Sequence, residues 1–171
     1  MREKFMISFS KVVSRQGVEV FSSAQSRKDA LKQLAPLLEE QLLEHEMSRQ
    51  ELYDMAIERE HVGSTSVGHG IAFAHCNSDN FKKLYAVIGI FPDGILSWST
   101  PDDEPVYILF LIASPGKEAC RYFAFISHIS RMLRAEELVS ALKQSRDPDY
   151  IYDFFAGWEK KYSKQLNSCG R

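Results

Sequence analysis

Eight consecutive apolar residues, Val106 to Ala113 (VYILFLIA), constrain the fold of this chain more than any other segment. The run is far shorter than the roughly 20 residues that a membrane-spanning helix requires. It has the length and apolar continuity of a strand that is covered on both faces. The run therefore predicts the central strand of a sheet that lies between two layers.

Three further segments have the composition of strands, and turn residues separate them. β-Branched and aromatic residues predict strands over 18–21, 71–75 and 84–91. The sequence Pro92-Asp93-Gly94 predicts a turn that ends the third of these strands. Between Val62 and Gly70 the composition changes abruptly to Gly, Ser, Thr and His, which predicts a loop.

Two helices are predicted in the first third of the chain. Ser26 and Ser48 each stand three residues before an acidic residue, as N-capping residues do, and apolar residues follow at helical spacing. A pair of helices joined by a short turn can bind DNA. However, residues 26–60 contain five basic and nine acidic residues. Their net charge of about -4 opposes binding to a phosphate backbone, and we expect no nucleic-acid partner.

The last third of the chain predicts helices over 117–133 and 135–144, followed by a final helix with Asp147 as N-cap and Pro148 as its first residue. The first of these helices has an apolar stripe of Phe123, Ile126, Ile129 or Ser130, and Leu133. Helices, then strands, then helices, without a repeat or a linker, predict a single α/β (α+β) domain over residues 1–171.

Composition excludes several classes of protein. The chain has 21 Lys and Arg against 23 Asp and Glu, so a strongly basic surface for nucleic acid or for a membrane is not expected. We expect neither a signal peptide nor membrane insertion. Three widely spaced cysteines, Cys76, Cys120 and Cys169, predict free thiols in a reducing cytoplasm.

Three of the five histidines, His61, His69 and His75, fall within fifteen residues. Their gaps of eight and six residues match no common pattern of metal ligands, so we predict no metal and no cofactor. Cys76 follows His75 directly, and neighbouring side chains of a strand point to opposite faces. The pair therefore cannot form a Cys–His catalytic dyad, and Cys76 is predicted to be a small buried side chain.

Histidine can also act as a nucleophile toward phosphoryl groups, because imidazole is largely neutral near pH 7. Such a reaction needs positioning and charge compensation. A guanidinium and a loop rich in N–H and hydroxyl donors would supply both. Arg59, the triplet Gly63-Ser64-Thr65, and His75 follow one another in this order. From the residues alone, a structural histidine with satisfied hydrogen bonds remains the alternative.

The segment from Arg59 to His75 (REHVGSTSVGHGIAFAH) closely resembles the signature R-E-x-x-G-S-T-x-[IV]-G-x-G-[IV]-A-[IV]-P-H. That signature belongs to the fructose/mannitol-type (type 2) enzyme IIA family of the bacterial phosphotransferase system. Asp103-Glu104-Pro105-Val106, the apolar strand after it and Pro115 are also similar to the family. The resemblance extends from about residue 18 to 155, and the sequence looks most similar to the nitrogen-regulatory branch.

This resemblance implies a mixed β-sheet flanked by helices and a phosphotransferase activity. By resemblance, His75 is the nucleophile that takes phosphate from phospho-HPr, Arg59 supports the phosphate, and Ser64 and Thr65 lie in the active-site loop. The downstream partners would be regulatory proteins. One alternative is a transport-coupled enzyme IIA that donates to a IIB domain, and a second is a binding module that has lost catalysis.

The sequence departs from the family at two positions. Ala74 stands where the family has proline, immediately before the active histidine. Tyr122 stands where the family commonly has a second histidine, and a phenol does not titrate near neutrality. Tyr122 either supports the site through a hydrogen bond or only packs against it. His61 and His69 are predicted to be exposed in a loop, and His45 and His128 to lie at the surface or boundary of helices.

Overall fold

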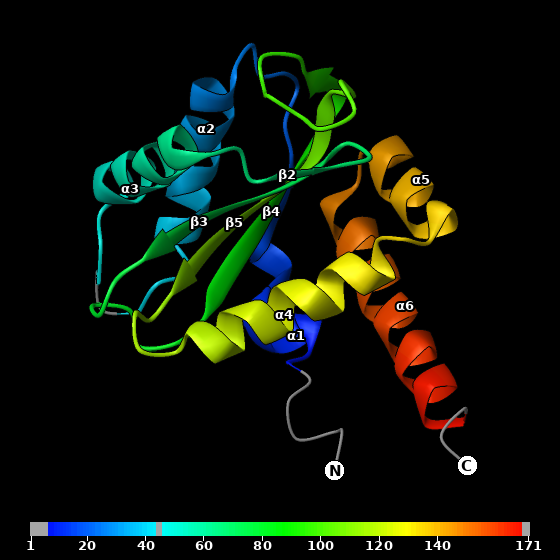
Figure 1. Ribbon diagram of the computed structural model, residues 1–171. Helices are drawn as coiled ribbons and strands as arrows, with labels where there is room; N and C mark the ends of the chain where they lie inside the picture. Colours follow the sequence, from blue (N-terminus) through cyan, green and yellow to red (C-terminus); the bar gives the residue numbers. More distant parts are fainter. Residues whose placement is uncertain (1–6, 44–45, 169–171) are drawn as a thin grey trace.

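The computed structural model describes residues 7–43 and 46–168. A five-stranded mixed sheet in the order β1-β4-β5-β3-β2 forms its centre (Figure 1). The strands are β1 (Val18–Val20), β2 (Ser66–Gly68), β3 (Ile71–Asn77), β4 (Tyr85–Ile95) and β5 (Val106–Ser114). Strand β5 lies between β4, to which it is antiparallel, and β3, to which it is parallel. Every residue of β5 except Tyr107 is buried, so the predicted central strand is confirmed.

Helices cover both faces of the sheet. They are α1 (Phe9–Val12), α2 (Arg27–Glu39), α3 (Arg49–Val62), α4 (Ala119–Met132), α5 (Glu136–Gln144) and α6 (Pro148–Ser168), with a 3-10 turn, η2, at Arg15–Gly17. Helices α2 and α3 pack on one face, and the other helices pack on the opposite face (Figure 1). Alternate side chains of β3, β4 and β5 therefore enter two separate cores, as expected for strands with a period of two. The predicted fold, a mixed sheet flanked by helices, is confirmed.

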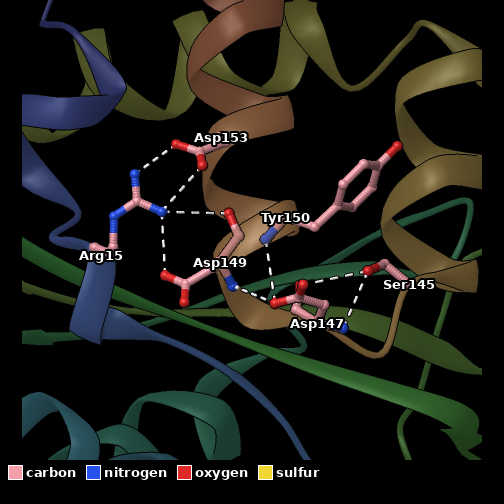
Figure 2. A network of polar contacts seen from close by, with 6 residues as sticks. All are labelled: Arg15, Ser145, Asp147, Asp149, Tyr150 and Asp153. Atoms are coloured by element: carbon pink, nitrogen blue, oxygen red, sulfur yellow. Dashed lines mark hydrogen bonds and ion pairs between the residues drawn. The ribbon is translucent and has the colours of Figure 1, made fainter.

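Three of the helix starts follow from local capping. The Ser26 hydroxyl accepts a hydrogen bond from the Asp29 N–H, and Ser48 forms a complete capping box with Glu51. At α6, a carboxylate oxygen of Asp147 accepts the N–H groups of residues 149 and 150, at 3.0 and 3.3 Å (Figure 2). These contacts satisfy N–H groups that lack partners inside the helix.

Arg15 joins the N-terminal segment to the first turns of α6. Its guanidinium forms ion pairs with Asp149 and Asp153 (Figure 2). The guanidinium also lies 4.7 Å from the centre of the Tyr152 ring. The ion pairs are largely exposed to solvent, where such pairs contribute little to stability. They connect the chain just before β1 with the first turns of α6.

The turn predicted at residues 92–94 is wrong, because β4 continues through it to Ile95. The pairing of β4 with β5 shifts register between Ile90 and Ile95, and Ile95 then pairs with Val106. Gly94 adopts a φ of +77°, which glycine reaches without strain. An irregularity of this kind accommodates Pro92, which has no N–H to donate to a ladder.

The loop predicted over 62–70 likewise contains a short strand, β2, that pairs with β3.

The predicted buried stripe of α4 is partly wrong. Phe123 is 66% exposed, whereas Phe125, Ile129 and Met132 are buried. His128, predicted at the surface or boundary, is 2% exposed, and its Nε2 lies 2.8 Å from a carboxylate oxygen of Glu159 on α6. Two apolar stripes run along α4, and the packing of α6 against it decides which of them is buried. His45 and Cys169 lie outside the described residues.

Candidate active site

His75 lies near the end of β3, on the sheet face that α4 and α6 cover. In the register of β3 with β5, it is the partner of Ile112. Ile71 and Phe73 share its face because side chains alternate along a strand. Both are buried, whereas His75 remains partly exposed. The imidazole is therefore held by a rigid central element and is still accessible to a partner molecule.

The ring of His75 contacts Tyr122 in the first turn of α4. The Tyr122 hydroxyl lies 2.9 Å from Nδ1 of His75, and the two ring centres are 4.9 Å apart. Burial raises the pKa of Tyr122 to about 12, so the phenol keeps its proton near neutral pH. When Nδ1 carries the imidazole proton, the phenol oxygen accepts it, and the lone pair of Nε2 is free. This contact can thus select the ring nitrogen that reacts.

The surroundings of His75 favour its neutral form. Burial lowers the pKa of this imidazole, and the positive charge of Arg59 lowers it further. The same charge acts on Tyr122, where it opposes the effect of burial on the phenol pKa. A neutral imidazole has a lone pair available for attack on an electrophile.

Arg59 lies in the last turn of α3. Its Nη1 donates a hydrogen bond to the carbonyl of Gly63, at 3.0 Å, just beyond the end of the helix. One side of the guanidinium is thereby fixed by the backbone of the loop. A guanidinium has five donors, so others remain for an anion such as phosphate.

The Gly-Ser-Thr loop is held in place by its own hydroxyl groups. The Ser64 hydroxyl donates to the carbonyl of Ser99 and accepts from the N–H of Ser66 at 3.2 Å. The Thr65 hydroxyl donates to the carboxylate of Glu60. Both hydroxyls are engaged within the protein, so the part that Ser64 and Thr65 would take in holding phosphate stays a prediction.

Glu60 is a residue of this site that our sequence analysis did not single out. It is 2% exposed, and its carboxylate accepts hydrogen bonds from both the N–H and the hydroxyl of Thr65. Two signals could have found it: Glu60 is the second residue of the segment that resembles the family signature, and it continues the apolar stripe of α3. Leu52, Ala56 and Glu60 follow one another at intervals of four, so the buried stripe of α3 ends in a carboxylate.

The other two histidines of this segment are His61 and His69. His61 and His69 are exposed, as predicted, but His61 lies in the last turn of α3 and not in a loop. His69, Asp102 and Glu104 bring potential ligand atoms within 4.8 Å of one another. Asp102 accepts the backbone N–H of His69 at 2.7 Å, and Glu104 pairs with Lys143 at 3.1 Å, so both carboxylates already have partners.

Cys76 is buried on the opposite face of β3, as expected, and burial raises the pKa of its thiol to about 12.

A cavity of about 750 Å³ lies beside the site, between β2 and β3 and the helices α4 and α5. Phe73 is part of its lining, but His75 is not.

Among residues 7–43 and 46–168, none of the helices combines the length and apolar character needed to cross a bilayer.

The fold of this chain, a mixed sheet between two helical layers, is similar to the folds of solved enzyme IIA structures. One solved structure, the nitrogen regulatory protein IIA-Ntr of Neisseria meningitidis, is similar with a TM-score of 0.76 at 17% identity, over 85% of this chain and 97% of that one. The enzyme IIA of the Escherichia coli mannitol system, solved in complex with phosphorylated enzyme IIB, is similar with a TM-score of 0.68 at 19% identity, over 83% and 95%.

Sequence comparison defines the family. Residues 11–157 match the family described as phosphoenolpyruvate-dependent sugar phosphotransferase system, EIIA 2, and the chain belongs to that family. A nitrogen regulatory protein of Bradyrhizobium diazoefficiens is 29% identical over 133 residues, which are 77% of this chain and 83% of the relative.

Proposed function

We propose that this protein is a phosphoryl carrier that accepts a phosphoryl group from phospho-HPr on Nε2 of His75 and acts in regulation. The observation that carries the proposal is the contact between Tyr122 and Nδ1 of His75, with the charge of Arg59 acting on both rings. It leaves one ring nitrogen unengaged by Tyr122, on a histidine whose pKa is lowered. The proposal includes a cytoplasmic location.

In this mechanism the lone pair of Nε2 attacks the phosphorus of the donor phosphohistidine. The new N–P bond forms as the donor's N–P bond breaks, and the donor nitrogen leaves with the electron pair of that bond. The proton on Nδ1 stays in place, shared with the phenol oxygen of Tyr122. Arg59 stabilises the charge on the phosphoryl oxygens during transfer, because phosphoryl transfer depends mainly on positioning and electrostatics.

The regulatory assignment is supported by relatives that are named nitrogen regulatory proteins, one of which this chain matches over most of its length. The alternative is a transport-coupled enzyme IIA that donates to a IIB domain. Its support is the mannitol enzyme IIA, which has been solved with phosphorylated enzyme IIB. Both hypotheses require the same chemistry at His75.

A third hypothesis is a binding module without catalysis, suggested by Ala74 and Tyr122. Ala74 is paired with Leu111 and is fully buried, and β3 continues two residues beyond His75. The alanine is therefore compatible with a fixed position of the histidine. Tyr122 contacts the imidazole directly rather than leaving a gap beside it. Both observations favour the active carrier.

Incubation with enzyme I, HPr and phosphoenolpyruvate, followed by intact-mass measurement, tests the proposal. We expect a mass gain of one phosphoryl group that requires HPr. The absence of that gain would favour the inactive module. Addition of a candidate IIB domain to the phosphorylated protein then separates the other two hypotheses, since rapid loss of the phosphoryl group to IIB is expected only of a transport-coupled protein.

A further inference from the structure

The end of α3 contains a buried carboxylate that the proposed chemistry does not use. The side chain of Glu60 is fully shielded from solvent. Arg27 on α2 is the cation beside it, with Nη1 3.7 Å from Oε2 of Glu60 and 3.3 Å from its backbone carbonyl. A charge in such a place is costly unless it is paired and hydrogen-bonded. The groups that contact the Glu60 carboxylate therefore indicate the role of this buried charge.

Those contacts lead to the loop that precedes β3. The Glu60 carboxylate accepts hydrogen bonds from both the N–H and the hydroxyl of Thr65, so one buried carboxylate holds two groups of this residue. The carbonyl of Thr65 in turn accepts the N–H of Phe73 at 3.1 Å. Phe73 is two residues from His75 on the same strand and the same face. A chain of hydrogen bonds thus joins Glu60 to the strand that carries the histidine.

The same anchor acts on the guanidinium. Arg59 is the residue directly before Glu60, and it donates to the carbonyl of Gly63, two residues before Thr65. The position of this carbonyl depends on where the loop is fixed. Contacts of Glu60 with Thr65 thus lie two residues from the carbonyl that accepts the Arg59 hydrogen bond.

We propose that Glu60 is a positioning residue for phosphoryl transfer, which acts through Thr65 on the loop that orients Arg59 and adjoins the strand of His75. This inference rests on the proposed function. It assigns the hydroxyl of Thr65 to the carboxylate of Glu60 rather than to the phosphoryl group. Because small misplacements of reacting groups have large effects on rate, loosening this anchor slows transfer without weakening the docking of the donor.

Thr65→Val is the decisive variant, because it removes the hydroxyl and leaves every charge and almost the whole side-chain volume unchanged. We expect the maximal transfer rate from phospho-HPr to fall about 10-fold to 100-fold, with the KM for phospho-HPr unchanged. Thr65→Ser, which keeps the hydroxyl, should restore the rate. Glu60→Gln should resemble Thr65→Val, and Thr65→Val decides alone if Glu60→Gln does not fold.

A matched control lies at the other end of the same two helices. Glu39 on α2 pairs with Arg49 on α3, with 2.8 Å between Oε2 and Nε, and this pair is remote from the loop. Glu39→Gln removes a carboxylate that joins α2 to α3, as Glu60 does. It should keep the wild-type rate. A rate loss in Glu39→Gln equal to that in Thr65→Val would mean that only general stability matters, and it would overturn the inference.

Amide hydrogen exchange at Phe73 provides a readout that does not depend on phosphoryl transfer. We expect faster exchange of this amide in Thr65→Val and wild-type exchange in Thr65→Ser. Wild-type rate and exchange in Thr65→Val would overturn the positioning role. If the unmodified protein accepts no phosphoryl group from HPr, the proposed function fails instead, and exchange at Phe73 alone decides whether the hydroxyl anchors the loop.

Discussion

The hydroxyl of Tyr122 lies 2.9 Å from Nδ1 of His75, although 47 residues separate them in the chain. The contact joins the first turn of α4 to the end of β3. It occupies one ring nitrogen of the imidazole with a group that does not titrate near neutral pH. If Tyr122 only packed in the core, its hydroxyl would not have to face Nδ1 of His75. The contact between the two groups can be tested by substitution.

Tyr122→Phe removes the hydroxyl and keeps the ring. A neutral hydrogen bond contributes about 0.5–1.5 kcal/mol, so we expect the transfer rate or equilibrium to change by a factor of about 2–12. Tyr122→His introduces a group with an ordinary pKa of about 6.5. Its transfer rate should acquire a pH dependence between about pH 5.5 and 7.5 beyond that of the unmodified protein. Rates measured against pH with HPr held constant check both expectations, and three superimposable profiles would exclude Tyr122 from the site.

His75→Ala should abolish phosphorylation by phospho-HPr, because it removes the imidazole that carries the proposed nucleophilic nitrogen. The phosphoryl group of the unmodified protein should be labile in acid and stable in base, as a phosphoramidate is. His61→Ala and His69→Ala are suitable controls, since both residues are exposed. Labelling of His75→Ala at the wild-type level would contradict the assignment.

Arg59→Lys should slow phosphoryl transfer markedly, because an ammonium cannot reproduce the paired hydrogen bonds of a guanidinium to phosphate. The free energy of unfolding should change by less than about 1 kcal/mol, as for most surface substitutions. Stopped-flow transfer from phospho-HPr and urea unfolding measure the two quantities. An unchanged rate would make Arg59 an ordinary surface charge.

Arg59→Gln should raise the pKa of His75 toward its ordinary value, since the Arg59 charge is one of the two causes that lower it. The lowered pKa of His75 also makes the stability of the fold depend on pH. A folded-state pKa below the unfolded one means that the unfolded chain binds more protons, so stability falls as the pH drops below about 6.5. That loss should be smaller in Arg59→Gln. NMR titration of the His75 ring and unfolding at several pH values measure the two effects, and identical titrations would contradict this account.

His128→Leu should lower the free energy of unfolding by about 1–3 kcal/mol, because it removes a hydrogen bond from a buried carboxylate. Glu159 would keep only its bond from the N–H of Phe9, at 2.7 Å. The phosphorylation rate should change little, since His128 does not contact His75. His61→Ala, at an exposed position, is the control for the unfolding measurement. Equal stability of the two variants would mean that the buried pair contributes nothing.

Several features could be predicted from the sequence because short-range interactions determine them. The apolar run from Val106 to Ala113 forms the central strand, because its length and its β-branched and aromatic residues suit a strand that is covered on both faces. Ser26, Ser48 and Asp147 cap helices through contacts within four residues. The predicted strands at 18–21 and 71–75 also depend on local composition, and both are present.

Only the tertiary structure decided which groups meet. The period of α4 is visible in the sequence, but the packing of α6 decides that Phe125 and His128 are buried and that Phe123 is exposed. Strand β4 continues past residues 92–94, where local turn preference predicted an end, because its pairing with β5 resumes at Ile95. The partners of Thr65 and His75 are a carboxylate on α3 and a phenol on α4. Spacing along the chain cannot specify such contacts, because they depend on how separate elements pack against one sheet.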